Sequence, residues 1–436
     1  MNKIKLLNKI NFIAILTLIL YLHIGSFLIS INIISVLTFS KILHALGIIF
    51  IIIYIINKII NKKNINFYDI IILLLTTCAI ISAKYAYDQE VALIGTHHRH
   101  EGLYTILSYY SFFLLSTTLN KKYHPIIMKT LVFLGVFQIL IGTIQTMRIE
   151  NILGYDRSEN FSANYYSASG TFMNPNFYST YILICVSYLI GNFKNQKTIK
   201  TRIISIFLIS IYVYGLIIGN TSSSILSFIA ILIFNGFGLL NKKNIKKNLK
   251  TIPIIIVVIL LAIPALLIVD KYKYHTLYKT MRNNVYEIMD IFKYGIKDTT
   301  GNSRIYVWKE TLKEVPKHAL TGIGIDNFLY IKDGQPILAT VEEKVLAFDK
   351  AHNDYLQILI TEGVFALIVY LILIIKVLYD SHSISKNKNN SGLILSFISY
   401  LCQMIMVFSV IMVAPIFYII IGFIVHNKKE EKEINI

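Results

Sequence analysis

Long apolar segments alternate with short polar connections along most of this chain. The runs from Ile48 to Ile56, Ile252 to Val269 and Val364 to Leu378 are examples. An apolar segment needs about 20 residues to cross the hydrocarbon core of a bilayer as a helix, and about twelve segments approach that length. They are residues 10–29, 39–57, 67–83, 102–119, 125–146, 176–192, 202–218, 222–240, 252–269, 358–379, 391–409 and 412–426.

The composition agrees with this pattern, because 55% of the residues are hydrophobic and only 15% are charged. A soluble domain could not bury that much apolar surface. We therefore expect an all-α polytopic membrane protein with about 12 transmembrane helices and one large extracytoplasmic loop that contains short helices. The expected parts are a first transmembrane block over 1–269, the loop over 270–357 and a C-terminal transmembrane block with a tail over 358–436.

The formal net charge of +18 first suggests nucleic acid, but the positions of the charges favour another explanation. Lysine and arginine gather in every second connection, which is the positive-inside pattern of membrane proteins. It places both termini in the cytoplasm, and an even number of spans agrees with that. The basic residues therefore indicate topology and contact with anionic lipid, and require no nucleic acid. The clusters lie near residues 3–9, 58–63, 121–122, 194–202, 242–250, 386–388 and 428–432.

With this topology the outward connections are 84–101, 147–175, a turn at 219–221 and the insert of about 270–357. No phosphate-binding glycine loop is present, which argues against an ATP-driven pump. Cys78, Cys185 and Cys402 all fall within apolar spans, so neither a disulfide framework nor a zinc site is supported. Any chemistry should take place outside, on a substrate that is already activated.

The large insert has helix and turn signals of its own. Ser303 can cap a helix that carries Arg304 and Trp308 and ends near Pro316. Glycine-containing turns are expected over 321–325 and 333–336. Asp349 can cap a further helix that carries His352 in its first turn and continues into the membrane near residue 358. The positive end of that helix would disfavour a protonated imidazole.

Two side chains of the insert are candidates for catalysis. A neutral His352 can accept a proton from a sugar hydroxyl, and the alternative is an interfacial histidine among lipid headgroups. Arg304 offers a planar guanidinium that holds phosphate oxygens bidentately, and the alternative is an ordinary solvated arginine.

Further polar residues precede two of the predicted spans. The cluster His97-His98-Arg99-His100 could ligate a transition metal, but adjacent histidines point in different directions, and we expect no metal site. Arg99 could instead contact an anion. Asn174 and Asn176 flank Pro175, and either can cap the following span or bind sugar hydroxyls. Nearby tyrosines fit an aromatic belt or sugar stacking, and the belt is favoured.

Taken in order, these motifs resemble the O-antigen ligase family, which includes O-antigen ligases, O-antigen-type polymerases and protein O-oligosaccharyltransferases. The resemblance is carried by His352-Asn353 with Gly363 after nine further residues, by Ser303-Arg304 with Trp308, and by three further stretches. Those are Gly322-Ile323-Gly324, Gly170 to Asn176, and Arg99 with Gly102. Where the family has Gly-x-x-Gly, this chain reads Gly363-Val364-Phe365-Ala366.

The resemblance implies a membrane glycosyltransferase of a bacterial cell membrane. It would move a glycan from undecaprenyl diphosphate to a hydroxyl of a glycan, lipid or protein acceptor, with inversion and without a cofactor or metal. By the same resemblance His352 is the base and Arg304 and Arg99 hold the diphosphate, while Asn174, Asn176, Trp308 and Asn353 are candidates for substrate binding. Ligase, polymerase and protein transferase differ only in the acceptor, and the sequence leaves these open, together with a less favoured lipid-glycan flippase.

Overall fold

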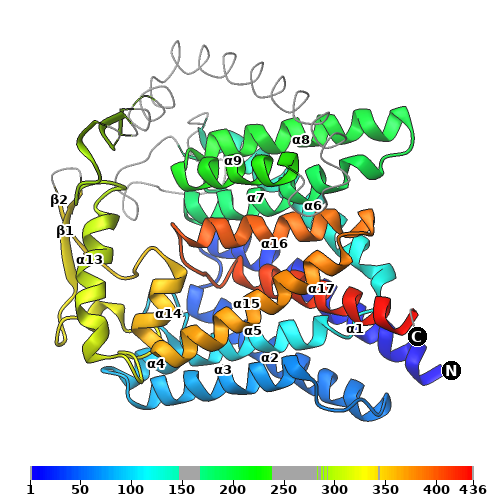
Figure 1. The fold of residues 1–436 in the computed structure, drawn as a ribbon, viewed down its shortest axis with the longest axis horizontal. Helices are drawn as coiled ribbons and strands as arrows, with labels where there is room; N and C mark the ends of the chain where they lie inside the picture. The colour runs from blue at the N-terminus through cyan, green and yellow to red at the C-terminus, as the bar shows by residue number, and fades with distance from the viewer. Residues whose placement is uncertain are drawn as a thin grey trace.

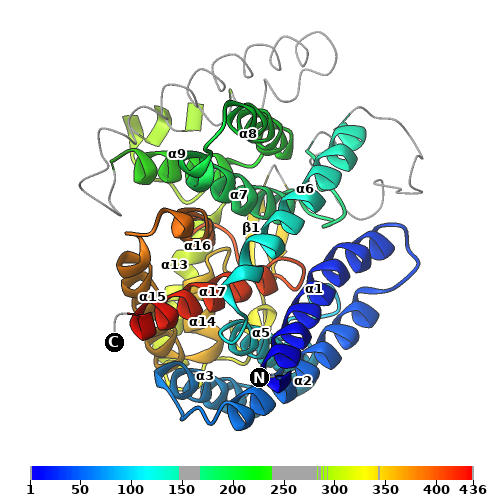
Figure 2. The same ribbon diagram turned by 90° about the vertical axis from the view of Figure 1, so that its right-hand side faces the viewer.

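The computed structural model describes residues 2–146, 167–237 and, apart from short gaps at 283–285, 288, 292 and 342–343, residues 282–434. The predicted span over 252–269 lies outside these residues. The described part is a helical bundle whose long helices run side by side (Figures 1 and 2). They are α1 (Asn2–Ser30), α2 (Val36–Ile60), α3 (Phe67–Lys84), α5 (Leu103–Ser116), α6 (His124–Thr146), α7 (Pro175–Asn192), α8 (Ile199–Gly219), α9 (Ser222–Phe237), α15 (Val364–Ile384), α16 (Ser391–Met404) and α17 (Ala414–Ile434).

Six helices of the described part are long and apolar enough to cross a membrane: residues 3–30, 36–60, 67–84, 121–146, 199–219 and 364–384. The expected count of about twelve spans is therefore not confirmed, although the all-α membrane architecture is supported. Many isoleucines and leucines on the outer surface of these helices are exposed, among them Ile49, Ile52, Leu73 and Ile375. Exposure of so many apolar side chains to water is unfavourable, whereas the hydrocarbon chains of lipids would cover them.

The interior of the bundle is formed by helices from both ends of the chain. Nearly every residue of α7 is buried, and α7 packs along α16. Helix α17 lies between α5, α15 and α16, and its first turns are buried on all sides. A helix that is apolar all round is favourable only where other helices surround it.

One group of shorter elements gathers at one end of the bundle, and both chain ends lie at the other (Figure 1). These elements are α4 (Gln89–Ile94), α13 (Arg304–Glu314), β1 (Ile337–Val341), β2 (Lys344–Phe348) and α14 (Asp354–Glu362). The remaining short helices are η1 (Lys121–Tyr123), η2 (Phe193–Asn195), η4 (Val315–Lys317), η5 (Phe328–Tyr330) and η6 (Lys388–Asn390).

Strands β1 and β2 form an antiparallel hairpin that the sequence analysis did not predict. Ile337 pairs with Phe348 in the register of the hairpin, and both side chains are buried in a small core with Val307 of α13 and Ile360 of α14. The hairpin therefore leads the chain from α13 back to the residues that precede α14.

The predicted span over 358–379 is not one continuous helix. Gly363 ends α14 and begins α15 with φ 91°, a conformation that side chains rarely adopt. A Cβ at Gly363 would also lie 2.6 Å from the carbonyl oxygen of Leu320. Helix α14 consequently leaves the axis of α15 and lies at the outer end of the bundle (Figure 1).

The predicted spans over 391–409 and 412–426 also have different boundaries. Helix α16 ends at Met404, and residues 405–413 form an irregular segment before α17 begins at Ala414. The segment is apolar, so its composition resembles that of a span. Its buried Phe408 contacts His352 in the loop that precedes α14, and its half-buried Ser409 binds Asp354, the first residue of α14.

Candidate active site

His352 lies just before α14 and not within its first turn, which corrects the sequence prediction. The cap of α14 is Asn353, whose side-chain oxygen accepts a hydrogen bond from the backbone N–H of Leu356 (3.0 Å). The predicted cap, Asp349, is engaged elsewhere. His352 has φ 51°, in the left-handed region, where a non-glycine residue costs about 1–3 kcal/mol. Surrounding contacts must therefore hold this backbone in place.

The peptide group of Ala351 provides two of these contacts. The indole Nε1–H of Trp308 donates to the carbonyl oxygen of Ala351 (2.9 Å), and the backbone N–H of Ala351 donates to Oε1 of Gln357 (2.8 Å). One partner belongs to α13 and the other to α14. Both backbone polar groups of Ala351 are thereby hydrogen-bonded. Trp308 therefore helps to hold the backbone next to His352 in place.

Replacing Trp308 by Phe should keep the aromatic packing but remove the N–H donor. We expect a loss of about 0.5–1.5 kcal/mol from the missing hydrogen bond and a decrease in kcat with little change in donor KM. Thermal unfolding and steady-state transfer kinetics of Trp308→Phe measure both. A variant that loses donor affinity but keeps kcat would instead support the substrate-binding role suggested by the sequence.

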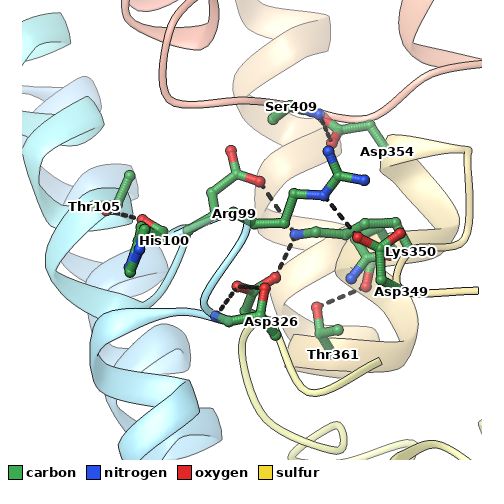
Figure 3. Close-up of polar contacts among 12 residues, drawn as sticks. Arg99, His100, Thr105, Asp326, Asp349, Lys350, Asp354, Thr361 and Ser409 are labelled. Carbon is green, nitrogen blue, oxygen red and sulfur yellow. Dashed lines mark hydrogen bonds and ion pairs between the residues drawn. The ribbon is translucent and has the colours of Figure 1, made fainter. Parts of the chain in front are cut away.

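Arg99 is brought next to the His352 loop from a distant part of the chain. Its Nε–H donates to Oδ2 of Asp349 (2.7 Å; Figure 3). Its guanidinium lies over the ring of Phe408 at 5.0 Å from the centroid. The ring of His352 lies 5.1 Å from the same phenylalanine. Because only Nε is used in the ion pair, the terminal nitrogens of Arg99 are left for another anion.

Arg304 begins α13, as predicted, but its neighbour Ser303 does not cap the helix. The hydroxyl of Ser303 donates to the carbonyl oxygen of Thr340 on β1 (2.7 Å), and Ser303 has φ 63°. Among the described residues, Arg304 makes no ion pair within 4.0 Å. Burial lowers the pKa of its guanidinium, and Glu287 partly opposes this. Arginine stays charged nonetheless, so Arg304 is a cation with no ion-pair partner within 4.0 Å among the residues that the structure describes.

The His352 imidazole is partly buried and is held neutral. Burial, followed by the positive charges of Arg304 and Arg99, lowers its pKa to about 3, while Asp349 opposes the shift. The sequence analysis expected the same direction from the start of a helix, but the main causes are burial and the two arginines. Both arginines therefore lie close enough to His352 to influence its protonation.

A buried group of charges lies next to Asp349 and Arg99. The ammonium of Lys350 contacts Oδ1 of Asp326 at 2.8 Å and Oε2 of Glu101 at 3.1 Å (Figure 3). Asp326 also accepts hydrogen bonds from the backbone N–H and the hydroxyl of Thr96. Burial alone would lower the pKa of Lys350, but Asp326 and Glu101 outweigh it, so the net pKa is raised.

A cavity of about 610 Å³, including its open mouth, adjoins the loop and is lined by both polar and apolar side chains. Glu101, Lys350 and Asp354 line it together with Glu362 and several tyrosines. Asp354 accepts hydrogen bonds from the backbone N–H and the hydroxyl of Ser409 (2.8 and 2.9 Å). Burial raises the pKa of Glu101 to about 7 and that of Glu362 to about 8. Phe408 lines the cavity and also contacts the His352 ring, so it lies between the two.

The glycine turn that follows α13 supports α14 from outside. Gly322 has φ 70°, and a Cβ there would lie 2.1 Å from the carbonyl oxygen of Thr361. The N–H groups of Ile323 and Gly324 donate to the carbonyl oxygens of Ile360 and Thr361. Only glycine allows the two backbones to approach so closely, which explains this part of the motif.

The predicted asparagines have structural contacts. Asn174 caps α7, because its side-chain oxygen accepts from the backbone N–H of Asn176 (2.8 Å). Asn176 is placed at the start of α7, next to Phe177, over whose ring Arg99 also lies. This end of α7 thus adjoins the Arg99 side of the site, while Asn353 serves as the α14 cap.

The histidines beside Arg99 lie close to one another but form no metal centre. The ring of His97 lies 5.4 Å from that of His98 and 6.1 Å from that of His100. Within the described ranges, no group of three or more His, Cys, Asp or Glu residues could hold a metal ion.

Sequence reasoning missed Glu101, Asp326, Lys350, Phe408 and Ser409. Glu101 and Lys350 had a weak signal, since they lie beside Arg99 and Asp349, but nothing in the sequence pairs residues 249 positions apart. Phe408 and Ser409 had no signal, because they lie in a segment that reads as a span.

Residues 206–371 match the protein-family model described as O-Antigen ligase. The matched range contains Arg304, Trp308, His352 and Asn353, and Arg99 and the two α7 asparagines lie before it. No curated protein matches the chain. With the apolar helices, the family match supports a multi-pass membrane protein.

Proposed function

We propose that this chain, whose match over residues 206–371 supports assignment to the O-antigen ligase family, transfers a glycan from undecaprenyl diphosphate to an acceptor hydroxyl. The observation that carries the proposal is that burial and the charges of Arg304 and Arg99 keep the imidazole of His352 neutral at one end of a helical bundle. A proton acceptor beside two cations suits a reaction in which a hydroxyl attacks and a diphosphate leaves.

His352 and the arginines have complementary roles in this reaction. The acceptor oxygen attacks the anomeric carbon of the donor sugar on the face opposite the diphosphate, and its proton passes to the imidazole of His352. The bond from the anomeric carbon to the diphosphate oxygen breaks, and its electron pair leaves with the diphosphate. Because the acceptor attacks the face opposite the diphosphate, the step inverts the configuration of the anomeric carbon. Arg304 and the terminal nitrogens of Arg99 stabilise the charge on the leaving diphosphate, a role for which this mechanism requires no metal.

The position of the site also supports an extracytoplasmic reaction. The lysine-rich chain ends lie at the opposite end of the bundle from α13 and from α14, which begins two residues after His352 (Figure 1). By the positive-inside rule, the chain ends belong in the cytoplasm and the site faces outward from the bacterial cell membrane. A lipid-linked donor reaches that face already activated.

The pH dependence of transfer should differ between the free enzyme and the donor complex. The two arginines lower the pKa of His352, and a bound diphosphate would offset their charge and raise it again. We expect kcat/KM, which reports the free enzyme, to show no acid limb near about 6.5, and kcat to show a limb at higher pH than kcat/KM. Initial rates over a pH series test this, and coincident limbs near about 6.5 would contradict it.

The direct test uses the purified protein in lipid nanodiscs with an undecaprenyl-diphosphate glycan as donor. Acceptors are offered separately: a glycolipid, a peptide with hydroxyl side chains, and a second lipid-linked glycan. We expect undecaprenyl diphosphate to be released together with a new glycosidic bond to one acceptor. Chain extension on the lipid-linked glycan alone would identify a polymerase. Movement of intact donor across a bilayer without a new bond would support a flippase and overturn the proposal.

A further inference from the structure

Two ion pairs of opposite polarity join the same two segments of the site. In one pair the cation Arg99 comes from the segment before α5, and the anion Asp349 comes from the His352 loop. In the other pair the anion Glu101 comes from the first segment, and the cation Lys350 comes from the second. Arg99 and Glu101 are two residues apart in the first segment, and Asp349 and Lys350 are adjacent in the second.

We propose that Lys350, with Glu101 and Asp326, is a positioning residue that fixes the register between the Arg99 segment and the His352 loop. The proposal deepens the proposed function and rests on it. A shift of one residue would place Lys350 opposite Arg99, where like charges repel. The alternating pattern therefore admits one alignment and disfavours its neighbour.

The burial of the group supports this role. The side chain of Lys350 is 4% exposed, that of Glu101 5% and that of Asp326 0%. Removing three charges from water is unfavourable, and an apolar replacement of such a group is often at least as stable. A gain in stability therefore explains this buried group of charges poorly. Specifying one alignment of two segments is a role that buried ion pairs have in some proteins.

Asp326 extends the connection to a third segment. Its carboxylate binds Lys350 on one oxygen and the N–H and hydroxyl of Thr96 on the other. Asn327 next to it accepts a hydrogen bond from the backbone N–H of Asp88 (2.8 Å). The glycine turn, the Arg99 segment and the His352 loop are therefore held together at Lys350, and a small displacement there would separate His352 from Arg99.

The test is a neutral triple variant, Lys350→Met with Glu101→Gln and Asp326→Asn. It removes the three charges that pair with one another and keeps similar side-chain volumes, so no member of this group is left charged without its partner. We expect it to fold and to lose roughly 10²-fold in kcat with little change in donor KM, as a misplacement of about 1 Å would cause. Lys350→Arg, which keeps the cation, should retain more activity than the neutral variant.

The matched control is a neutralised pair at the far end of α15, Lys376→Met with Asp380→Asn. Lys376 and Asp380 form an ion pair there, and Tyr68 also binds Asp380. This variant should lose stability without a comparable fall in kcat. In the triple variant the acid limb of kcat/KM should move to higher pH, because Arg99 no longer lies against the loop, and the control should not show this shift.

Hydrogen exchange provides a readout that does not depend on activity. The triple variant should exchange faster in both 95–102 and 349–353, and the control in neither. Unchanged kcat in a folded triple variant, or unchanged exchange in 95–102, would overturn the positioning role. If the wild-type protein transfers no glycan, the proposed function fails, and the exchange comparison alone decides whether Lys350 fixes the register.

Discussion

His352→Ala should abolish most glycan transfer, with a loss of roughly 10²–10⁴-fold in kcat, the usual contribution of a general base. The variant removes the imidazole that packs against Phe408 and whose pKa the two arginines lower, and it leaves Arg99 and Arg304 in place. Donor binding should therefore change little. Release of undecaprenyl diphosphate and binding of the lipid-diphosphate donor to the same nanodisc preparation measure the two effects separately.

Two variants control for the backbone and for loss of a histidine in general. His352→Asn removes the base but suits the left-handed conformation at φ 51° better than alanine does. It should be as inactive as His352→Ala. His318→Ala removes another partly buried histidine of the same insert and should retain activity. Full transfer by folded His352→Ala or His352→Asn would remove the catalytic role of His352.

Arg304→Lys should impair transfer although it keeps the positive charge. Lysine lacks the planar fork, so one of two hydrogen bonds to the diphosphate is lost. A hydrogen bond to a charged group contributes about 1.5–3 kcal/mol, which corresponds to a roughly 10- to 100-fold decrease in kcat/KM. Arg304→Ala should cost more, on the order of 10²–10³-fold, as for the loss of a group that stabilises developing charge.

Arg304→Ala has a second expected effect, on the protonation of His352. Arg304 is the largest electrostatic cause of the lowered His352 pKa, so its removal should raise that pKa and move the acid limb of kcat/KM upward. The matched control is Lys309→Ala, which removes an exposed ion pair with Asp298 from the same helix. The control should leave kcat/KM and its pH profile unchanged. Equal activity of Arg304→Lys and wild type would contradict the diphosphate clamp.

The insert shows which local features a sequence pattern can predict. The helix that begins at Arg304 ends at Glu314, close to the Pro316 boundary expected from its apolar spacing. The turn at Asp333-Gly334 is present, and Asn174 caps α7. Each of these features depends on residues close together in the chain, so local backbone chemistry is sufficient to predict it.

Other boundaries could not be predicted because tertiary contacts determine them. Gly363 looked like one glycine in an apolar run, yet close packing against Leu320 requires its φ of 91° and separates α14 from α15. Helix α16 ends at Met404 inside an apolar stretch, and Ser409 of the following segment binds Asp354 from a distant part of the chain. Composition carries no information about such contacts.

The sequence by itself determined the helical membrane architecture and the identity of the three candidate residues His352, Arg304 and Arg99. The architecture follows from the length of the apolar segments, and the candidate residues follow from the chemistry of an imidazole and a guanidinium. Only the tertiary structure decided that Arg304 and Arg99 lie near enough to His352 to lower its pKa, that Asn353 and not Asp349 caps α14, and that Lys350 lies buried between Glu101 and Asp326. Those outcomes depend on packing between segments far apart in the chain, where burial and neighbouring charges determine what each side chain can do.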